Sequence, residues 1–217
     1  MSNIKNAFSK GKAFIPFITC GQISLDITEK TIYEMEKNGA NLIELGIPFS
    51  DPVAEGSIIQ SANNRALKNG TTTDKIFSML ESVRKNTDIP MVFMTYANIV
   101  FSYGIDRFAE KSKKLKIDGI ILPDVPYEEK KEFDSIFKNH NIDFISLIAP
   151  TSEERISAIA KDSNGFIYCV SSLGVTGIRK NINTNIEKMV NLVKSVNNIP
   201  VAVGFGISTP RQAKEMS

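Results

Sequence analysis

The chain of 217 residues contains no tryptophan, one histidine, His140, and two cysteines, Cys20 and Cys169. Each cysteine lies alone in an apolar segment, which is typical of a small buried residue rather than of a disulfide. One histidine and no cysteine–histidine cluster argue against a transition-metal site. We expect His140, in the polar run KNHNID, to lie in a surface loop.

Long apolar runs and an excess of one charge are also missing. No apolar stretch approaches the roughly 20 residues of a membrane span, and the N-terminal segment lacks the apolar centre of a signal peptide. A cytoplasmic location is therefore expected. The 26 basic and 24 acidic residues give no electrostatic reason to expect nucleic acid or an anionic membrane as a partner. A hydrophobic content of 42% is enough for one substantial core.

Seven apolar segments typical of buried strands alternate with segments of helical periodicity. The predicted strands are 13–19, 42–47, 90–95, 119–122, 144–148, 166–170 and 200–203. The predicted helices are 25–37, 57–68, 73–85, 106–115, 128–137 and 184–195, with two more that begin at Ser152 and at Thr209-Pro210. This alternation predicts an α/β fold with a parallel sheet, and its regularity favours one (β/α)8 TIM-barrel domain over an open dinucleotide-binding sheet.

The alternation stops before an eighth strand. A barrel of this kind typically needs about 250 residues, and this sequence ends at Ser217, within the helix that follows the seventh strand. Without an eighth strand, the edges of the first and seventh strands would stay unpaired. We therefore expect 1–217 to be a C-terminally incomplete barrel, as a fragment of a longer reading frame or as a truncated form, the fragment being favoured.

The most informative stretch is NLIELGIPFSDPVAEGSIIQSA, residues 41–62. One carboxylate, Glu44, interrupts its apolar strand, and a charged side chain buried in a strand is costly unless it is paired, neutralised or used. The strand then ends in a loop with two prolines, and Glu55 follows just before a helix. Two acidic groups thus lie on and beyond the end of one strand, where α/β proteins place their chemistry.

ELGIPFSDPVAEG closely resembles the signature of the tryptophan synthase alpha family, ELG-[IV]-PFSDP-x-ADG. Three later segments agree with the same family in order and spacing: MTYANIVFSYGID, SSLGVTG and VAVGFGIS. The resemblance covers essentially the whole chain. It implies a TIM barrel and a lyase that cleaves indole-3-glycerol phosphate by a retro-aldol reaction, late in L-tryptophan biosynthesis. It also implies a partner, the beta subunit of an α2β2 heterotetramer, and no cofactor, since the pyridoxal phosphate of such complexes belongs to the beta subunit.

The resemblance assigns the general acid/base role to Glu44, for which a buried salt bridge is the structural alternative. It places Glu55 where the family has the aspartate that accepts the indole N–H. This is a departure, because Glu keeps the charge but adds a methylene, and a misplacement of about 1 Å can cost two orders of magnitude in rate. A solvated loop carboxylate is the alternative for Glu55.

The other residues that the resemblance implies are a substrate-binding set and a supporting or partner-facing set. The substrate-binding set is Tyr96, Tyr168, Thr176, Gly177, Phe205 and Gly206. The two glycines would offer backbone N–H groups to a phosphate, although turn glycines and strand-end aromatic residues are also common without any ligand. The supporting or partner-facing set is Pro48, Ser50, Asp51 and Asp124.

Two loops carry further expectations. After the first strand the family has G-D-P, where this chain has Gly21-Gln22-Ile23, so the geometry of that loop is open. The segment 174–183, with its glycines and Arg179-Lys180, is interpreted as a mobile lid.

Two further functions compete with the lyase. An alpha-like chain with little or no lyase activity could bind and activate a beta subunit, because Glu55 and the altered first loop weaken catalysis more than docking. Another phosphate-sugar barrel enzyme would share the phosphate site but has no reason to contain ELGIPFSDP. Glu44→Gln separates the first two functions, since it should abolish cleavage and leave partner binding intact.

Overall fold

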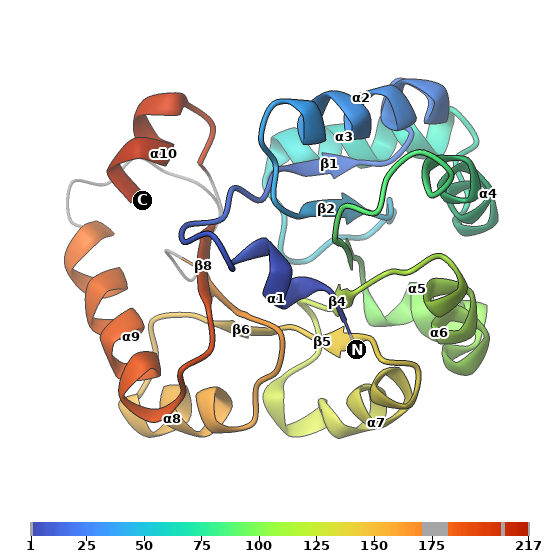
Figure 1. The fold of residues 1–217 in the computed structure, drawn as a ribbon. Helices are drawn as coiled ribbons and strands as arrows, with labels where there is room; N and C mark the ends of the chain where they lie inside the picture. The colour runs from blue at the N-terminus through green and yellow to red at the C-terminus, as the bar shows by residue number, and fades with distance from the viewer. Residues whose placement is uncertain (1, 171–181, 205–206, 217) are drawn as a thin grey trace. The chain divides into compact units, whose positions relative to one another are not determined.

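The computed structural model describes residues 2–170, 182–204 and 207–216, and its chain divides into two compact units, Met1–Phe144 and Ile145–Ser217. The first unit contains a five-stranded sheet in the order β1-β2-β3-β4-β5, and the second a three-stranded sheet, β6-β7-β8 (Figure 1). Every pair of neighbouring strands is parallel. The strands are β1 (Phe17–Thr19), β2 (Ile43–Gly46), β3 (Met91–Met94), β4 (Gly119–Ile121), β5 (Asp143–Phe144), β6 (Ser146–Ile148), β7 (Ile167–Val170) and β8 (Val201–Gly204).

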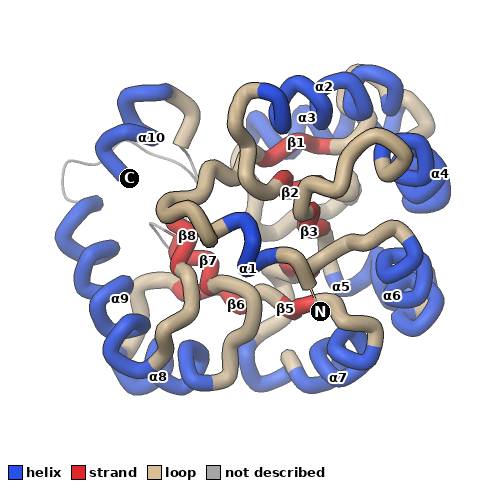
Figure 2. The backbone as a smooth tube through the Cα atoms, in the orientation of Figure 1, coloured by secondary structure: helices blue, strands red, loops and turns tan. Residues whose placement is uncertain are grey.

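Helices follow the strands, as the alternation predicts (Figure 2). In the first unit they are α1 (Ile4–Ala7), α2 (Leu25–Lys37), α3 (Ser57–Lys68), α4 (Thr73–Val83), α5 (Ala97–Tyr103), α6 (Ile105–Lys114), the 3-10 helix η1 (Tyr127–Glu129) and α7 (Lys131–Asn139). In the second unit they are α8 (Glu153–Lys161), α9 (Ile182–Val196) and α10 (Pro210–Met216). Side-chain caps at Ser24, Thr72 and Ser152 fix the starts of α2, α4 and α8, because each hydroxyl accepts a backbone N–H of the first turn.

Two local features differ from the prediction. The predicted strand 144–148 is interrupted at Ile145, so that β5 pairs with β4 and β6 pairs with β7. Two helices, α1 and α5, were not expected; α5 begins directly after β3 because Asp124 accepts the N–H of Ala97. His140 lies in the turn directly after α7, in line with the predicted surface loop, and its Nδ1 lies 2.9 Å from the Ile136 carbonyl.

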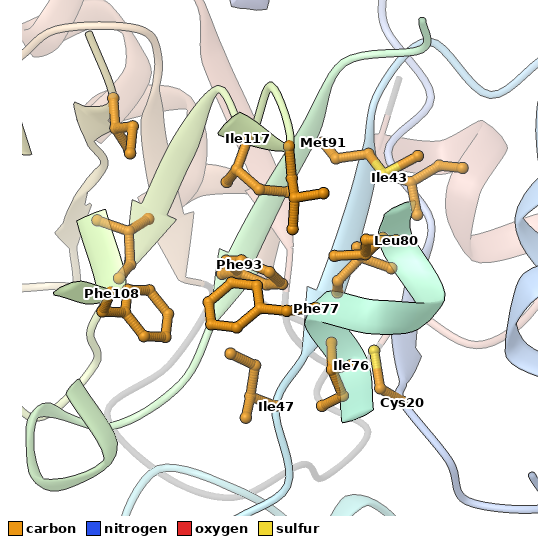
Figure 3. Close-up of a cluster of buried hydrophobic side chains, with 14 of the residues drawn as sticks. Cys20, Ile43, Ile47, Ile76, Phe77, Leu80, Met91, Phe93, Phe108 and Ile117 are labelled. Atoms are coloured by element: carbon orange, nitrogen blue, oxygen red, sulfur yellow. The ribbon is translucent and has the colours of Figure 1, made fainter. Parts of the chain in front are cut away.

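One face of the β1–β5 sheet packs against the helices of the first unit. Phe77 of α4 reaches the ring of Phe93 on β3, with centroids 5.9 Å apart, and the ring of Phe108 on α6, at 5.4 Å (Figure 3). Leu80 of α4 and Ile43 of β2 belong to the same cluster of buried side chains. Since alternate residues of a strand point to opposite faces, this packing decides which residues face away from the helices.

The residues that face away include Glu44. It is paired in register with Phe17 of β1 and Val92 of β3, and Gly46 is paired with Thr19 and Met94. Paired residues of neighbouring strands share a face of the sheet. The sheet therefore presents a carboxyl group on a face that is otherwise mostly apolar.

In the second unit, α8 packs against α9, and both lie beside the β6–β8 sheet. Cys169 on β7 is fully buried, as Cys20 is in the first unit, and both are free thiols. The prediction that the two cysteines are small core residues is confirmed.

Candidate active site

Glu44 lies in the middle of β2 with only 2% of its surface exposed. Burial raises the pKa of its carboxyl from 4.5 to about 8, because removing the carboxylate from water disfavours the charged form. Among the described residues, no cation pairs with this carboxyl, which argues against the salt-bridge alternative. Glu44 is therefore a buried acid that holds its proton at neutral pH and can both give and take one.

Gly46 makes room beside Glu44. A Cβ at this position would lie 2.6 Å from Cζ of Phe17, so the ring of Phe17 covers the glycine. Phe17 shares the Glu44 face of the sheet and is half-buried. Sequence reasoning did not single out Phe17, since only the strand register shows that it is the direct neighbour of Glu44.

Glu55 lies in the loop between β2 and α3, one residue before Gly56, the N-cap of α3. Its carboxylate Oε2 accepts a hydrogen bond from Nδ2 of Asn63 at 2.5 Å, and its backbone carbonyl accepts one from Nε2 of Gln60 at 2.8 Å. Burial raises the pKa of the Glu55 carboxyl, and the hydrogen bonds from Asn63 and Tyr96 act in the opposite direction. Glu55 is half-buried and held in place, unlike a solvated loop carboxylate.

Tyr96 connects this loop to β3. The residue follows β3, is only 2% exposed, and its hydroxyl accepts the N–H of Ala54 at 3.2 Å. The hydroxyl also donates to the Glu55 carboxylate. The ring of Tyr96 packs on Phe49, with centroids 5.1 Å apart. Tyr96 thus connects the end of β3 to the loop that carries Glu55.

Asp124 supports the same region from the loop after β4. Each of its carboxylate oxygens lies 3.1 Å from the N–H of Ala97, the first residue of α5. An acceptor there satisfies an N–H that has no partner within the helix. Asp124 thereby fixes the start of α5 directly after Tyr96.

The predicted partner-facing residues do not behave alike. Pro48 is already buried in the isolated chain, so it supports the loop from within. Ser50 and Asp51 are exposed, and the Ser50 hydroxyl donates to the Asp51 carboxylate. Val53, in the same loop, is 78% exposed.

The remaining substrate-binding residues belong to the second unit. Tyr168 lies on β7 and is half-buried. A Cβ at position 204 would lie 2.3 Å from its hydroxyl, so the lack of a side chain at Gly204 leaves room for Tyr168. Thr176, Gly177, Phe205 and Gly206 lie outside the described residues, as does most of the segment 174–183 that was interpreted as a lid.

The loop that departs from the family pattern after β1 is held by the end of α3. Nδ2 of Asn69 donates to the carbonyls of Gly21, at 3.2 Å, and Ile23, at 2.8 Å. The Gln22 side chain accepts a hydrogen bond from Arg65 at 3.2 Å. These contacts define the geometry of the loop without the Asp-Pro pair of the family.

The described residues were also compared with the requirements of a metal site and of a membrane span. They contain no group of three or more His, Cys, Asp or Glu side chains that could hold a metal ion. None of the helices in this part of the chain combines the length and the apolar character that crossing a bilayer requires.

Comparison with known proteins identifies the family. A family model described as "Tryptophan synthase alpha chain" matches residues 3–217. The tryptophan synthase alpha chain of Clostridium acetobutylicum is 46% identical over 209 residues, which are 96% of this chain and 80% of that protein. The alpha chain of Lacticaseibacillus casei is 45% identical over 217 residues, covering 100% of this chain and 82% of that protein.

Solved structures agree. The tryptophan synthase alpha subunit of Campylobacter jejuni matches with a TM-score of 0.88 and 32% identity, over 100% of this chain and 86% of that chain. A chain of the a2b2 complex of Pyrococcus furiosus matches with a TM-score of 0.84 and 34% identity, over 94% and 82%. The predicted α/β fold of the TIM-barrel class is confirmed by these neighbours. The chain therefore belongs to the tryptophan synthase alpha family, whose members are lyases that cleave indole-3-glycerol phosphate to indole and glyceraldehyde 3-phosphate in L-tryptophan biosynthesis.

Proposed function

We propose that Glu44 is the acid and base of this lyase reaction. In the retro-aldol cleavage, C3 of the indole gains a proton, the hydroxyl on the adjacent side-chain carbon loses one, and the bond between those two carbons breaks. Its electron pair returns to the indole ring while the hydroxyl carbon becomes the aldehyde. A carboxyl with a pKa of about 8 is protonated at neutral pH, so Glu44 can give its proton to C3 and then accept the hydroxyl proton.

Glu55 is proposed to stabilise the indole nitrogen. Protonation at C3 places positive charge on that nitrogen, and a carboxylate that accepts its N–H lowers the energy of the charged state. Burial raises the pKa of Glu55, and the hydrogen bonds from Asn63 and Tyr96 act against that rise, in favour of the ionised form. This carboxylate therefore takes the role of the family's aspartate, as a group of the same charge and one more methylene.

The rest of the proposed site binds and orients the substrate. The proposed roles, taken from the family resemblance, are contact with the indole for Tyr96, Tyr168 and Phe205, and donation of backbone N–H groups to the phosphate for Gly177 and Gly206. Thr176 and Asp124 support them. Holding the phosphate and the ring together contributes orientation, which brings C3 to the Glu44 carboxyl.

The proposed partner is a tryptophan synthase beta subunit, in an α2β2 heterotetramer like the a2b2 complex of Pyrococcus furiosus. The exposed Ser50 and Asp51 are the proposed contacts, on the loop that Pro48 supports from within. We further propose that 1–217 belongs to one TIM-barrel domain and acts in the cytoplasm, without a cofactor of its own.

The observation that carries the proposal is the buried, proton-holding carboxyl of Glu44, and the test is indole release from indole-3-glycerol phosphate with and without a beta subunit. We expect release by the parent chain and none by Glu44→Gln. Binding of the beta subunit, measured by titration calorimetry, should be unchanged in the variant. Cleavage by Glu44→Gln would refute the role of Glu44. No release by the parent, together with activation of the beta subunit, would instead make the chain a docking partner with a decayed active site.

A further inference from the structure

Asn63 is a polar residue on the buried side of α3. It is only 3% exposed, between Ala62 and Ala66, which are buried on the same helix. A buried amide is costly unless it makes hydrogen bonds. Its Nδ2 donates to the Glu55 carboxylate at 2.5 Å, so the burial of this amide is explained by Glu55.

The two donors to Glu55 come from different elements. Asn63 reaches it from α3, and the Tyr96 hydroxyl reaches it from the end of β3. Tyr96 is itself tied to the loop by the N–H of Ala54. The Glu55 carboxylate is therefore held from two sides at the end of a side chain one methylene longer than an aspartate.

We propose that Asn63 is a positioning residue that, with Tyr96, holds the longer Glu55 carboxylate where it can accept the indole N–H. This inference rests on the proposed lyase function. A freely rotating glutamate would divide its population among several rotamers, and only some would place the carboxylate correctly. Asn63 selects one of them and favours the ionised form, because it donates to the carboxylate.

The first test measures the ionisation of Glu55 itself. Carbon NMR of the carboxyl group in glutamate-labelled protein monitors it as the pH is changed. Asn63→Leu removes the donor at similar volume, and Asn63→Ala does so without adding volume in case the leucine variant does not fold. Both should raise the pKa of Glu55. The matched control is Asn64→Leu, the same substitution at the next residue, which is exposed; it should leave that pKa unchanged. An unchanged pKa in the Asn63 variants would overturn the inference, whatever the activity of the parent.

The second test is kinetic. Asn63→Leu should lower kcat for indole release by about tenfold to a hundredfold, as expected for the loss of a hydrogen bond to a charged group. KM should change less, because charge on the indole nitrogen develops only during the reaction. Asn64→Leu should retain the parent rate.

Repeating the substitution in a Glu55→Asp background separates positioning from general support of α3. The shorter side chain draws the carboxylate away from Asn63, so Asn63→Leu should then cost about threefold or less. An equal loss in both backgrounds would show that Asn63 acts through the helix, and would overturn the inference. A parent chain that releases no indole would refute the proposed function, while the NMR titration would still decide whether Asn63 holds Glu55.

Discussion

The buried carboxyl of Glu44 should make the stability of the protein depend on pH in a way that one substitution removes. Below about pH 4.5 the carboxyl is protonated in both the folded and the unfolded chain, and it adds no pH dependence. Between pH 4.5 and about 8 the unfolded chain loses this proton and the folded chain keeps it. The folded state then binds more protons than the unfolded state, so its stability falls as the pH rises. Above about pH 8 both states are ionised and the loss is complete.

The size of this effect follows from the two pKa values. With 4.5 in the unfolded chain and about 8 in the folded chain, at about 1.4 kcal/mol for each factor of ten, the full loss is about 5 kcal/mol. About 4 kcal/mol of it falls between pH 5 and pH 9. This is a large share of the stability of an ordinary domain, which is about 5–15 kcal/mol. Glu44→Gln removes the titration and leaves a neutral side chain of nearly the same shape.

The measurement is urea unfolding of the parent and of Glu44→Gln at pH 5, 7 and 9. The free energy of unfolding of the variant, relative to the parent, should rise by about 4 kcal/mol from pH 5 to pH 9. Other groups that titrate in this range contribute equally to both proteins, so the difference isolates Glu44. Two stability curves that stay parallel within about 1 kcal/mol would show that Glu44 ionises normally, and would remove the physical basis for its proposed role as acid and base.

Three further substitutions test the surroundings of the site. Gly46→Ala places a Cβ 2.6 Å from Cζ of Phe17, so we expect a loss of about 1–3 kcal/mol in the free energy of unfolding. The rate of indole release should also fall, because the Phe17 ring beside Glu44 must move. A parent-like rate would show that the position of the Phe17 ring is unimportant. Asp124→Ala removes the acceptor of the Ala97 N–H; thermal unfolding should show a loss of about 1 kcal/mol, and a loss near zero would mean that water replaces the carboxylate. Arg84→Met removes hydrogen bonds to backbone carbonyls after α4 and α6; it should destabilise by about 3 kcal/mol without changing the rate per folded molecule, and a changed rate would connect this region to the site.

Local patterns were enough to predict the helices that begin at a side-chain cap or follow a clear apolar stripe. The bounds of α2 and α3 agree with the prediction to the residue. The break between β5 and β6 could not be predicted, since it depends on which strand each half pairs with and not on the residues themselves. Strand lengths were overestimated for the same reason: an apolar run such as 13–19 continues beyond its paired part, which here is only Phe17–Thr19.

Glu44 stood out in the sequence because a carboxylate within an apolar strand is costly if it is buried, and the structure shows that this side chain is buried. Phe17 gave no such signal, because an aromatic residue in an apolar strand is ordinary until the register pairs it with Glu44. Asn63 is an intermediate case. A polar residue between two alanines on one helix face indicates a buried amide, but the pattern does not name the acceptor.

Glu55 shows why a substitution cannot be judged from the substituted position alone. By itself, the extra methylene of glutamate predicts a misplaced carboxylate and a slower enzyme. The structure adds two donors, Asn63 at 2.5 Å from the helix that follows Glu55 and Tyr96 from the end of β3. A longer side chain that is held at its end has one defined position, and in the proposed role of Glu55 that position matters more than the number of carbons before the carboxylate. If Asn63 positions Glu55 as proposed, the cost of glutamate at this position depends on Asn63 and Tyr96, and a comparison of active sites that aligns only the acidic residue would miss it.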